Sequence, residues 1–172
     1  WEHPHWRRLD QATVRAVHDF FVNDGDVLFL FAVCIRSAED FETPAAVDEV
    51  FIPLMDRLRA EDDIAVIASP ALAWLPVNVS RLGVAQTDAE NVYELLLVHC
   101  REMNNRFLII DPPRGLHGDL LTRWVREFRS RERHTRSYCA LYYPWLFEGE
   151  TIFPPSASLA GIYARIEREN GE

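Results

Sequence analysis

A single α/β domain, with a mainly parallel and possibly mixed sheet and helices on both faces, is the fold class that the sequence predicts. Helix-like and strand-like apolar patterns alternate along the chain, and such alternation produces parallel sheets flanked by helices. The strand-like runs are continuously apolar, which is typical of strands covered on both faces. The length of 172 residues suits one domain over residues 1–172.

The first helix and the first strand are expected near the start of the chain. Residues 9–21 carry apolar side chains at helical spacing. Asn23-Asp24-Gly25 should end this helix, with Gly25 in the left-handed conformation. Residues 27–35 (VLFLFAVCI) form a continuous apolar run and are predicted to be a buried strand.

A second helix and a second strand should follow. Residues 46–58 are apolar at i, i+3, i+4 and i+7, and Pro53 either kinks this helix or marks a later start. Residues 64–68 are predicted to be the second buried strand. Residues 71–86 give no periodic signal and are expected to form a long loop.

The second half of the chain continues the alternation. A capping box at residues 87–90 (TDAE) predicts the start of a third helix that ends at Met103. The remaining predicted elements are a strand at 107–110, a helix at 116–131, a strand at 138–143 and a helix that begins at 154–156 and ends near 169.

Charge excludes several classes of function. The net charge is −9 and all 18 basic residues are arginine. Nucleic acid is therefore not expected as a partner, and no lysine can form a Schiff base or hold a phosphate. Residues 1–100 sum to −10 and residues 101–172 to +1. The two halves either match one another in a head-to-tail polymer or differ without functional meaning.

Metal and cofactor binding are not expected. Cys34, Cys100 and Cys139 lie far apart in apolar segments and are predicted to be buried, reduced thiols. His3 and His5 are close enough to touch a metal, but they are more simply surface residues near the start of the sequence. The chain has no glycine-rich phosphate loop or nucleophile motif. It has no run of about 18 apolar residues, so membrane insertion is not expected.

One alternative with chemistry stays open at Asp111. The segment LIIDPPRG places this carboxylate directly after an apolar strand, where open α/β sheets bind their ligands. A small enzyme or ligand-binding domain would use the strand ends near Ser69, Asp111 and Tyr143. In the other interpretation Asp111 caps the turn made by the two prolines that follow it. Without a lysine or a glycine-rich loop, no catalytic, cofactor-binding or metal-binding residue is predicted.

Seven arginines lie between Arg114 and Arg136, against three acidic residues. Arg129, Arg131 and Arg133 crowd the end of the predicted helix 116–131, where positive charge is favoured by the helix dipole. These arginines either form a solvated helix end or make a basic patch for an acidic partner surface.

Three stretches carry a family resemblance. LYYPWL at 141–146 is followed by PPSASLAGIYAR at 154–165, and the other two stretches are RFLIIDPPRG at 106–115 and FFVNDGDVLFLFAV at 20–33. The first pair resembles the contractile tail sheath signature, Tyr-Tyr-Pro-Trp and then Pro-Pro-Ser-Gly-x-x-Ala-Gly-x-x-Ala-Arg. The other two are similar to further sheath segments, in the same order along the chain.

The resemblance implies a structural subunit and not an enzyme. Such a subunit polymerises as hexameric rings around an inner tube and contracts to drive the tube through a target envelope, without a cofactor. Its implied partners are other sheath subunits, the tube protein and a baseplate. It would assemble in the bacterial cytoplasm as part of a phage tail or injection particle. The chain departs from the family at Asp24 and Ala157, which stand where the family has glycine, and it would be a sheath core whose terminal arms are absent.

The final helix is the expected tube-binding element. Leu159, Ile162, Tyr163 and Ile166 are predicted to form its core-facing stripe. The opposite side is predicted to carry Ala157, Gly161, Ala164, Arg165 and Arg168. It is either a plain solvent face or a face that a partner approaches closely. The resemblance favours the second interpretation, with Gly161, Arg165 and Arg168 against the tube.

Overall fold

A computed structural model describes residues 11–35, 43–80, 85–87, 89–131 and 134–171. The helices are α1 (Gln11–Val22), α2 (Pro44–Arg59), α3 (Ala89–Met103), α4 (Gly118–Arg131) and α5 (Ser156–Asn170), with 3₁₀ helices η3 (Pro70–Trp74) and η4 (Arg136–Tyr138). The strands are β1 (Val66–Ala68), β2 (Val77–Val79), β3 (Ala85–Thr87), β4 (Phe107–Ile110), β5 (Cys139–Leu141), β6 (Leu146–Glu148) and β7 (Thr151–Phe153). The sequence-based interpretations of His3, His5 and Arg133 fall outside the described residues.

A three-stranded parallel sheet in the order β1-β4-β5 forms the centre of the molecule. Val66 lies opposite Phe107, and Leu108 lies opposite Cys139. Helix α3 precedes β4 and helix α4 connects β4 to β5, so helices carry the chain between parallel neighbours. Two antiparallel pairs, β2–β3 and β6–β7, lie outside this sheet. The predicted α/β fold with a mainly parallel sheet is confirmed.

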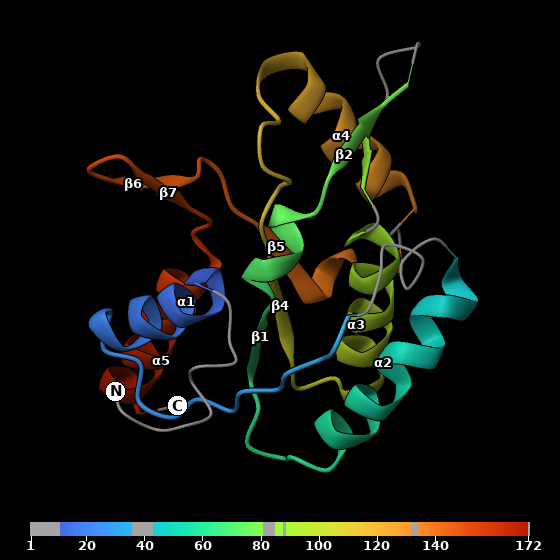
Figure 1. Ribbon diagram of the computed structural model, residues 1–172. Helices are drawn as coiled ribbons and strands as arrows, with labels where there is room; N and C mark the ends of the chain where they lie inside the picture. The colour runs from blue at the N-terminus through green and yellow to red at the C-terminus, as the bar shows by residue number, and fades with distance from the viewer. Residues whose placement is uncertain (1–10, 36–42, 81–84, 88, 132–133, 172) are drawn as a thin grey trace.

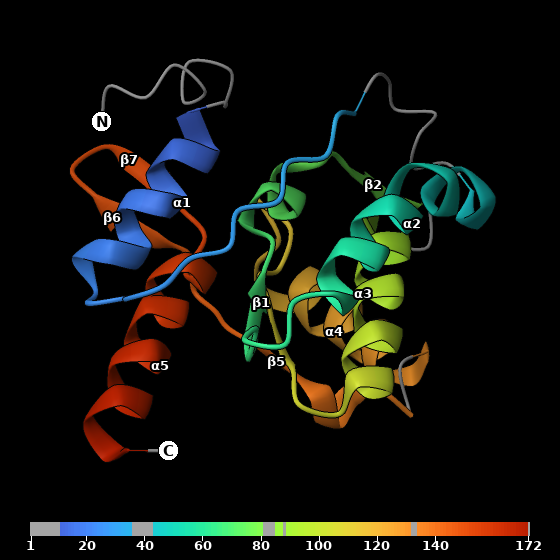
Figure 2. The same cartoon turned by 90° about the horizontal axis from the view of Figure 1, so that it is seen from below.

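Helices cover both faces of the sheet. Figures 1 and 2 show α1 and α5 packed together on one side, and α2 and α3 on the other. The middle strand, β4, is therefore covered from both directions, and its Leu108, Ile109 and Ile110 are fully buried. Its continuous apolar run is therefore explained by burial on both faces, as predicted from the sequence.

Helix α2 begins with a Thr43 cap, whose Oγ1 accepts a hydrogen bond of 3.2 Å from the Ala46 amide. Pro53 lies inside the helix, which runs without interruption from Pro44 to Arg59. Proline removes one backbone donor, and this proline stands on the exposed side of the helix. The side chains that α2 buries are Val47, Phe51, Met55 and Leu58.

A buried arginine closes the far end of α2. Arg106 is 2% exposed and donates hydrogen bonds to the carbonyl oxygens of Leu58 and Glu61. Its Nη1 also lies 2.7 Å from Nε2 of His99. Burial, assisted by the charge of Arg106, lowers the pKa of His99 to about 4, so the imidazole is neutral and can accept this bond. The negative end of the α2 dipole thus offsets the buried positive charge.

The residue that ends α1 in the left-handed conformation differs from the predicted one. Asp24, with φ of 67°, is the left-handed residue, and the prediction of Gly25 for that position is wrong. The Gly25 amide donates to the Phe20 carbonyl at 3.0 Å. A side chain at Gly25 would overlap the Phe20 ring, so the glycine is required for close packing.

The predicted buried strand at residues 27–35 is wrong. This segment forms neither strand nor helix, and Val27 is 69% exposed. Phe31 and Val33 pack partly against the core, whereas Ala32 and Cys34, which follow each of them, are exposed. Residues 31–34 therefore cover the core with alternate side chains, and the backbone of the segment does not join the sheet. Strands β1 and β5 occupy both sides of the middle strand, so the apolar run does not become a central strand.

Residues 71–86 were predicted to be one long loop, and this is also wrong. They contain most of η3, all of β2 and the start of β3. The pair β6–β7 was missed as well. Its register joins Glu148 to Thr151 across a two-residue turn, with Gly149 at φ of 59°. A glycine in a two-residue turn between apolar segments is a hairpin signal that the sequence does contain.

Candidate functional site

Asp111 lies at the carboxyl end of β4 and is 1% exposed. Its Oδ1 accepts a hydrogen bond of 2.9 Å from the Ser156 amide, the first residue of α5. The carboxylate therefore caps a helix that begins 45 residues later, and not the proline turn beside it. Burial raises the pKa of Asp111 to about 6, although hydrogen bonding by Ser156 opposes the rise.

The space around Asp111 is occupied by side chains of the same chain. The Tyr93 hydroxyl donates to the Asp111 carbonyl at 3.3 Å, and Trp145 Nε1 donates to the Pro112 carbonyl at 2.9 Å. Trp74 packs edge-to-face on Trp145, with ring centroids 4.9 Å apart. These contacts tie the end of β4 to α3, η3 and the segment before β6.

The three residues of the enzyme alternative are not joined in a catalytic arrangement. Asp111 is buried, Ser69 is half-buried and Tyr143 is 50% exposed. Within the described residues, no hydrogen bond links the Asp111 carboxylate to Ser69 or Tyr143, and its Oδ2 atom is buried without a partner. The same part of the chain contains no cluster of three histidine, cysteine or acidic residues that could hold a metal.

The faces of α5 differ from those predicted. The residues that α5 buries are the small ones, Ser156, Ala157, Ser158 and Gly161. A side chain at Gly161 would overlap the Phe20 carbonyl of α1, so the surface that approaches this glycine closely belongs to the same chain. Ile166 of the predicted core stripe is 43% exposed. The small face packs on α1, and Gly161 is not available to a partner.

The two arginines of α5 remain accessible. Arg165 Nη1 lies 3.3 Å from Asp24 Oδ2, and Arg168 Nη1 lies 3.9 Å from Asp26 Oδ2. The side chains of Arg165 and Arg168 keep 38% and 50% of their surface exposed. The pairs connect the last turns of α5 to the segment that follows α1, and they leave part of each guanidinium group open.

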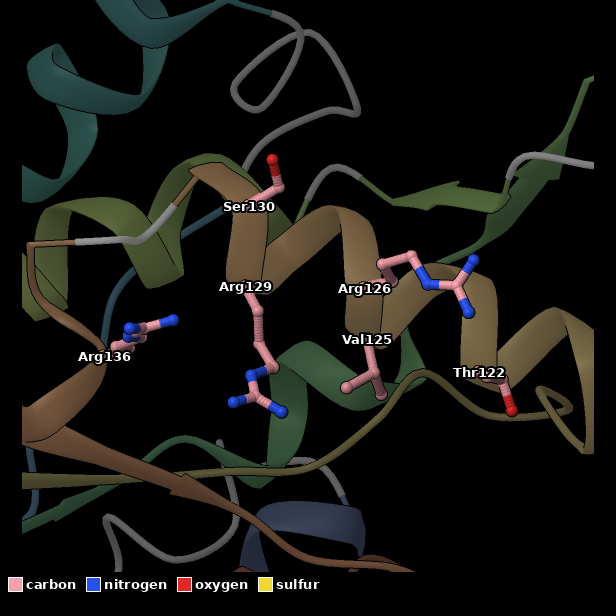
Figure 3. A pocket seen from close by; sticks show the side chains of 6 residues that line it. All are labelled: Thr122, Val125, Arg126, Arg129, Ser130 and Arg136. Carbon is pink, nitrogen blue, oxygen red and sulfur yellow. The ribbon is translucent and has the colours of Figure 1, made fainter.

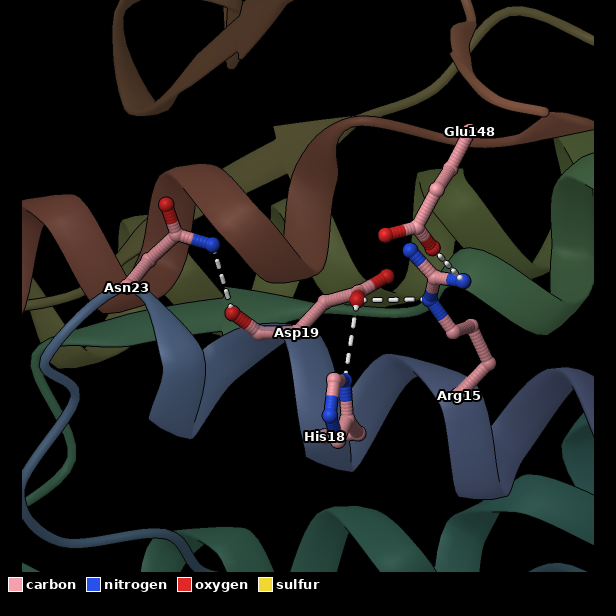
Figure 4. A network of polar contacts seen from close by, with 5 residues as sticks. All are labelled: Arg15, His18, Asp19, Asn23 and Glu148. Carbon is pink, nitrogen blue, oxygen red and sulfur yellow. Dashed lines mark hydrogen bonds and ion pairs between the residues drawn. The ribbon is translucent and has the colours of Figure 1, made fainter.

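A polar network joins α1 to the β6–β7 hairpin (Figure 4). Arg15 Nε lies 2.6 Å from Asp19 Oδ1, and its Nη1 lies 2.6 Å from Glu148 Oε2 of β6. The Arg15 guanidinium also stacks over the Phe153 ring, 4.0 Å from its centroid. The hairpin, which sequence analysis missed, is thereby held against the helix that packs on α5.

The arginines between 114 and 136 separate into two groups. Arg114 stacks on Trp74 at 4.8 Å, and Arg131 pairs with the buried Glu90. The others include three that line a hollow of about 560 Å³ beside α4 (Figure 3). We call this hollow the arginine groove; its lining residues are Thr122, Val125, Arg126, Arg129, Ser130 and Arg136.

The cysteines differ in exposure. Cys100 is buried, and burial raises the pKa of its thiol to about 12, so it is unreactive at neutral pH. Cys139 is half-buried, whereas Cys34 is exposed, contrary to prediction, because it lies on the outer side of the segment at residues 27–35. His99 and Cys100 are adjacent in α3, and His99 bonds to Arg106.

No protein-family profile matches the chain, and a comparison with curated proteins finds no match either. Among the described helices, none is both long and apolar enough to cross a membrane.

Proposed function

We propose that this chain is the core of a contractile tail sheath subunit, which polymerises as hexameric rings around an inner tube and contracts to drive it through a target envelope. Its partners would be other sheath subunits, the tube protein and a baseplate. The particle would assemble in the bacterial cytoplasm as a phage tail or a related injection machine. The proposal starts from the resemblance of residues 20–33, 106–115 and 141–165 to sheath sequences.

The observation that carries the proposal is that these three stretches meet in space. Asp111 caps the first residue of the segment 156–165, and Trp145 bonds to the Pro112 carbonyl. The hydroxyl groups of Tyr142 and Tyr163 are hydrogen-bonded to each other. Gly161 packs against the Phe20 carbonyl. Residues that resemble one family therefore contact one another in one part of the fold, which is consistent with their forming a single structural unit.

The polar groups of these stretches hold the fold together, as a mechanical element requires. A sheath uses stored free energy and rigid cores, and its proposed task involves no bond-breaking chemistry. The tube-facing residues we propose are now Arg165 and Arg168, without Gly161. Their exposed guanidinium groups suit carboxylates on a tube surface.

Electron microscopy tests the proposal directly. The natural full-length protein, produced together with its tube partner, should form striated cylinders around the tube. If the two proteins stay separate under conditions in which each is folded, the proposal is wrong.

A charge-reversal variant tests the tube-facing residues. Arg165→Glu with Arg168→Glu, in the full-length protein, should abolish assembly on the tube while circular dichroism shows an intact fold. The matched control is Arg57→Glu with Arg101→Glu, two exposed arginines on α2 and α3 that make the same charge change. Normal cylinders from the α5 variant would remove Arg165 and Arg168 from the tube interface.

A second candidate function rests on Asp111. A buried carboxylate with one unpartnered oxygen and a pKa of about 6 is typical of some catalytic acids. A small enzyme or ligand-binding domain at the strand ends would lose its turnover or its ligand in Asp111→Asn. The capping bond to Ser156 is a sufficient reason for a carboxylate at this position, so we rank this candidate second.

A further inference from the structure

The arginine groove concentrates positive charge for which the described residues supply no ion-pair partner. Arg126 and Arg129 come from α4, and Arg136 comes from η4 on the other side of the hollow. Figure 3 shows Arg129 and Arg136 extending into the same space from these two elements. Guanidinium groups that converge in this way repel one another unless an anion lies between them.

The neighbouring Arg131 is an arginine of the same helix that does have an ion-pair partner. It pairs with Glu90, whose side chain is only 7% exposed and also accepts a hydrogen bond of 2.8 Å from Trp124. No carboxylate of the described residues forms an ion pair with Arg126, Arg129 or Arg136. The groove also offers the hydroxyl groups of Thr122 and Ser130. Its chemistry suits a short run of carboxylates.

The chain itself carries such a run. Glu61, Asp62 and Asp63 are consecutive, and they form the turn between α2 and β1, which we call the acidic turn. Asp62 and Asp63 are exposed, and no ion pair of the described residues uses any of the three carboxylates. The acidic turn is therefore as unmatched in negative charge as the arginine groove is in positive charge.

Within one molecule, no ion pair of the described residues joins the two surfaces. In Figure 1 the turn after α2 lies at the bottom of the view, whereas α4 lies in the upper half. A contact between them needs two copies of the chain. It would be heterologous, because one copy uses its groove and the other its turn. Contacts of this kind build rings or helical arrays.

We propose that the arginine groove binds the acidic turn of a second copy of this chain. The inference rests on the proposed function to the extent that a sheath is a polymer of identical subunits. It adds the pair of surfaces that join one core to the next. Nucleic acid would satisfy the same arginines, but the net charge of −9 disfavours it.

Sedimentation velocity of the chain, at about 100 μM and at low and high salt, tests the contact. Wild type should self-associate at low salt and dissociate in about 0.3 M salt, since the contact is made by exposed charges. Arg129→Glu should weaken the association about tenfold or more. The control Arg101→Glu should change it less than about twofold. Arg101 is exposed and lies in the last turn of α3, as Arg129 lies in the last turn of α4, so both variants lose the same helix-dipole interaction.

A double variant that exchanges the two charges gives the decisive test. Arg129→Glu combined with Asp62→Arg should restore association, because every copy carries both changes and each altered groove meets an altered turn. The proposal is overturned if wild type stays monomeric at low salt, if Arg129→Glu behaves like Arg101→Glu, or if the swap fails to restore association. Binding of a labelled single-stranded oligonucleotide that Arg129→Glu abolishes would assign the groove to nucleic acid instead.

Failure of this contact and failure of the sheath function give different results. Cylinders that form equally well from wild type and from Arg129→Glu would keep the sheath and reject the groove contact. If wild-type full-length protein forms no cylinders although the chain self-associates through the groove and the turn, the sheath function fails and the contact stands.

Discussion

The arginines at the end of α5 and those beside α4 differ in how the chain compensates them. Arg165 and Arg168 reach Asp24 and Asp26, so their charge is partly matched within the molecule. Arg126 and Arg129 have no such partner among the described residues and line the same hollow as Arg136. Both groups occupy the same sequence context, arginines towards the end of an amphipathic helix.

The difference shows that arginines near the end of a helix can have different roles, which depend on the carboxylates around them. Near α5, the segment after α1 supplies carboxylates, so part of the positive charge serves the α1–α5 contact. Near α4, the described part of the chain gives an ion-pair partner to Arg131 alone, at Glu90. The α4 group is thus the stronger candidate for an external anion.

The largest effect is expected at Glu90, the residue that compensates Arg131. Glu90→Ala would leave the buried Trp124 N–H without its acceptor, at a cost of about 2–3 kcal/mol in the free energy of unfolding. Glu90→Gln keeps an acceptor for Trp124 and should cost clearly less. Urea denaturation measures both variants. Equal losses would mean that the Arg131 ion pair, and not the Trp124 bond, is what matters.

The next effect concerns the α1–α5 contact that brings Asp24 to Arg165. Gly161→Ala should lower the free energy of unfolding by about 2 kcal/mol, because the new methyl group meets the Phe20 carbonyl. In a free helix the same change would stabilise by about 1 kcal/mol. Ala164→Gly, in the same helix, measures the propensity term alone. A stabilised Gly161→Ala protein would show that α1 does not press on α5.

The start of α5, which Asp111 caps, is tested by measuring how the free energy of unfolding depends on pH. The pKa of Asp111 in the folded protein, about 6, lies above its ordinary value of 3.8, so the folded state binds this proton more tightly. The contribution of Asp111 to stability is therefore fully present below about pH 4 and is lost as pH rises through about 6. Asp111→Asn should match wild type near pH 4 and exceed it at pH 7 by on the order of 1–2 kcal/mol.

The quantity to follow is the difference in free energy of unfolding between wild type and Asp111→Asn. The lowered pKa of His99 gives the opposite pH dependence, with stability lost as pH falls from about 6.5 towards 4. Because His99 is present in both proteins, its effect cancels in the difference. A constant difference between pH 4 and pH 7 would contradict the raised pKa of Asp111.

The smallest effect compares the two arginine groups directly. Arg165→Glu with Arg168→Glu should cost less than about 1 kcal/mol, since exposed ion pairs contribute little. Arg126→Glu with Arg129→Glu should cost less than that or stabilise the monomer, because repulsion across the groove is relieved. Both variants are compared by urea denaturation of dilute protein at low salt. The reverse order would show that the groove is already neutralised within the chain.

Much of the fold was predictable because burial leaves a strong mark on sequence. The apolar run of β4 and the heptad-like spacing of α2 correspond to elements whose side chains are buried. The run at residues 27–35 has the same composition, yet it lies on the surface of the core, because composition does not reveal which edges of a sheet are already occupied. The hairpin β6–β7 was missed since each strand has only three residues.

The candidate site was less predictable, for a geometric reason. Helical periodicity divided α5 into an apolar face and a small face, and the apolar face was assigned to the core. In the structure the fully buried residues are small ones, including Ala157 and Gly161, because at Gly161 the backbone of α1 approaches α5 directly. Leu159, Ile162 and Tyr163 of the predicted core stripe are half-buried. Likewise Asp111 was assigned to its neighbouring prolines, whereas its hydrogen bond goes to Ser156. Partners that are distant in sequence decide both cases.

The buried Arg106 has a consequence for the acidic turn that lies beside it. By donating to the carbonyl oxygens of Leu58 and Glu61, it holds the end of α2 and the first residue of the acidic turn. A segment already held in one shape loses little conformational entropy when a partner binds it. The Glu61 end of the acidic turn is thus held before any binding, by a positive charge that is buried inside the protein.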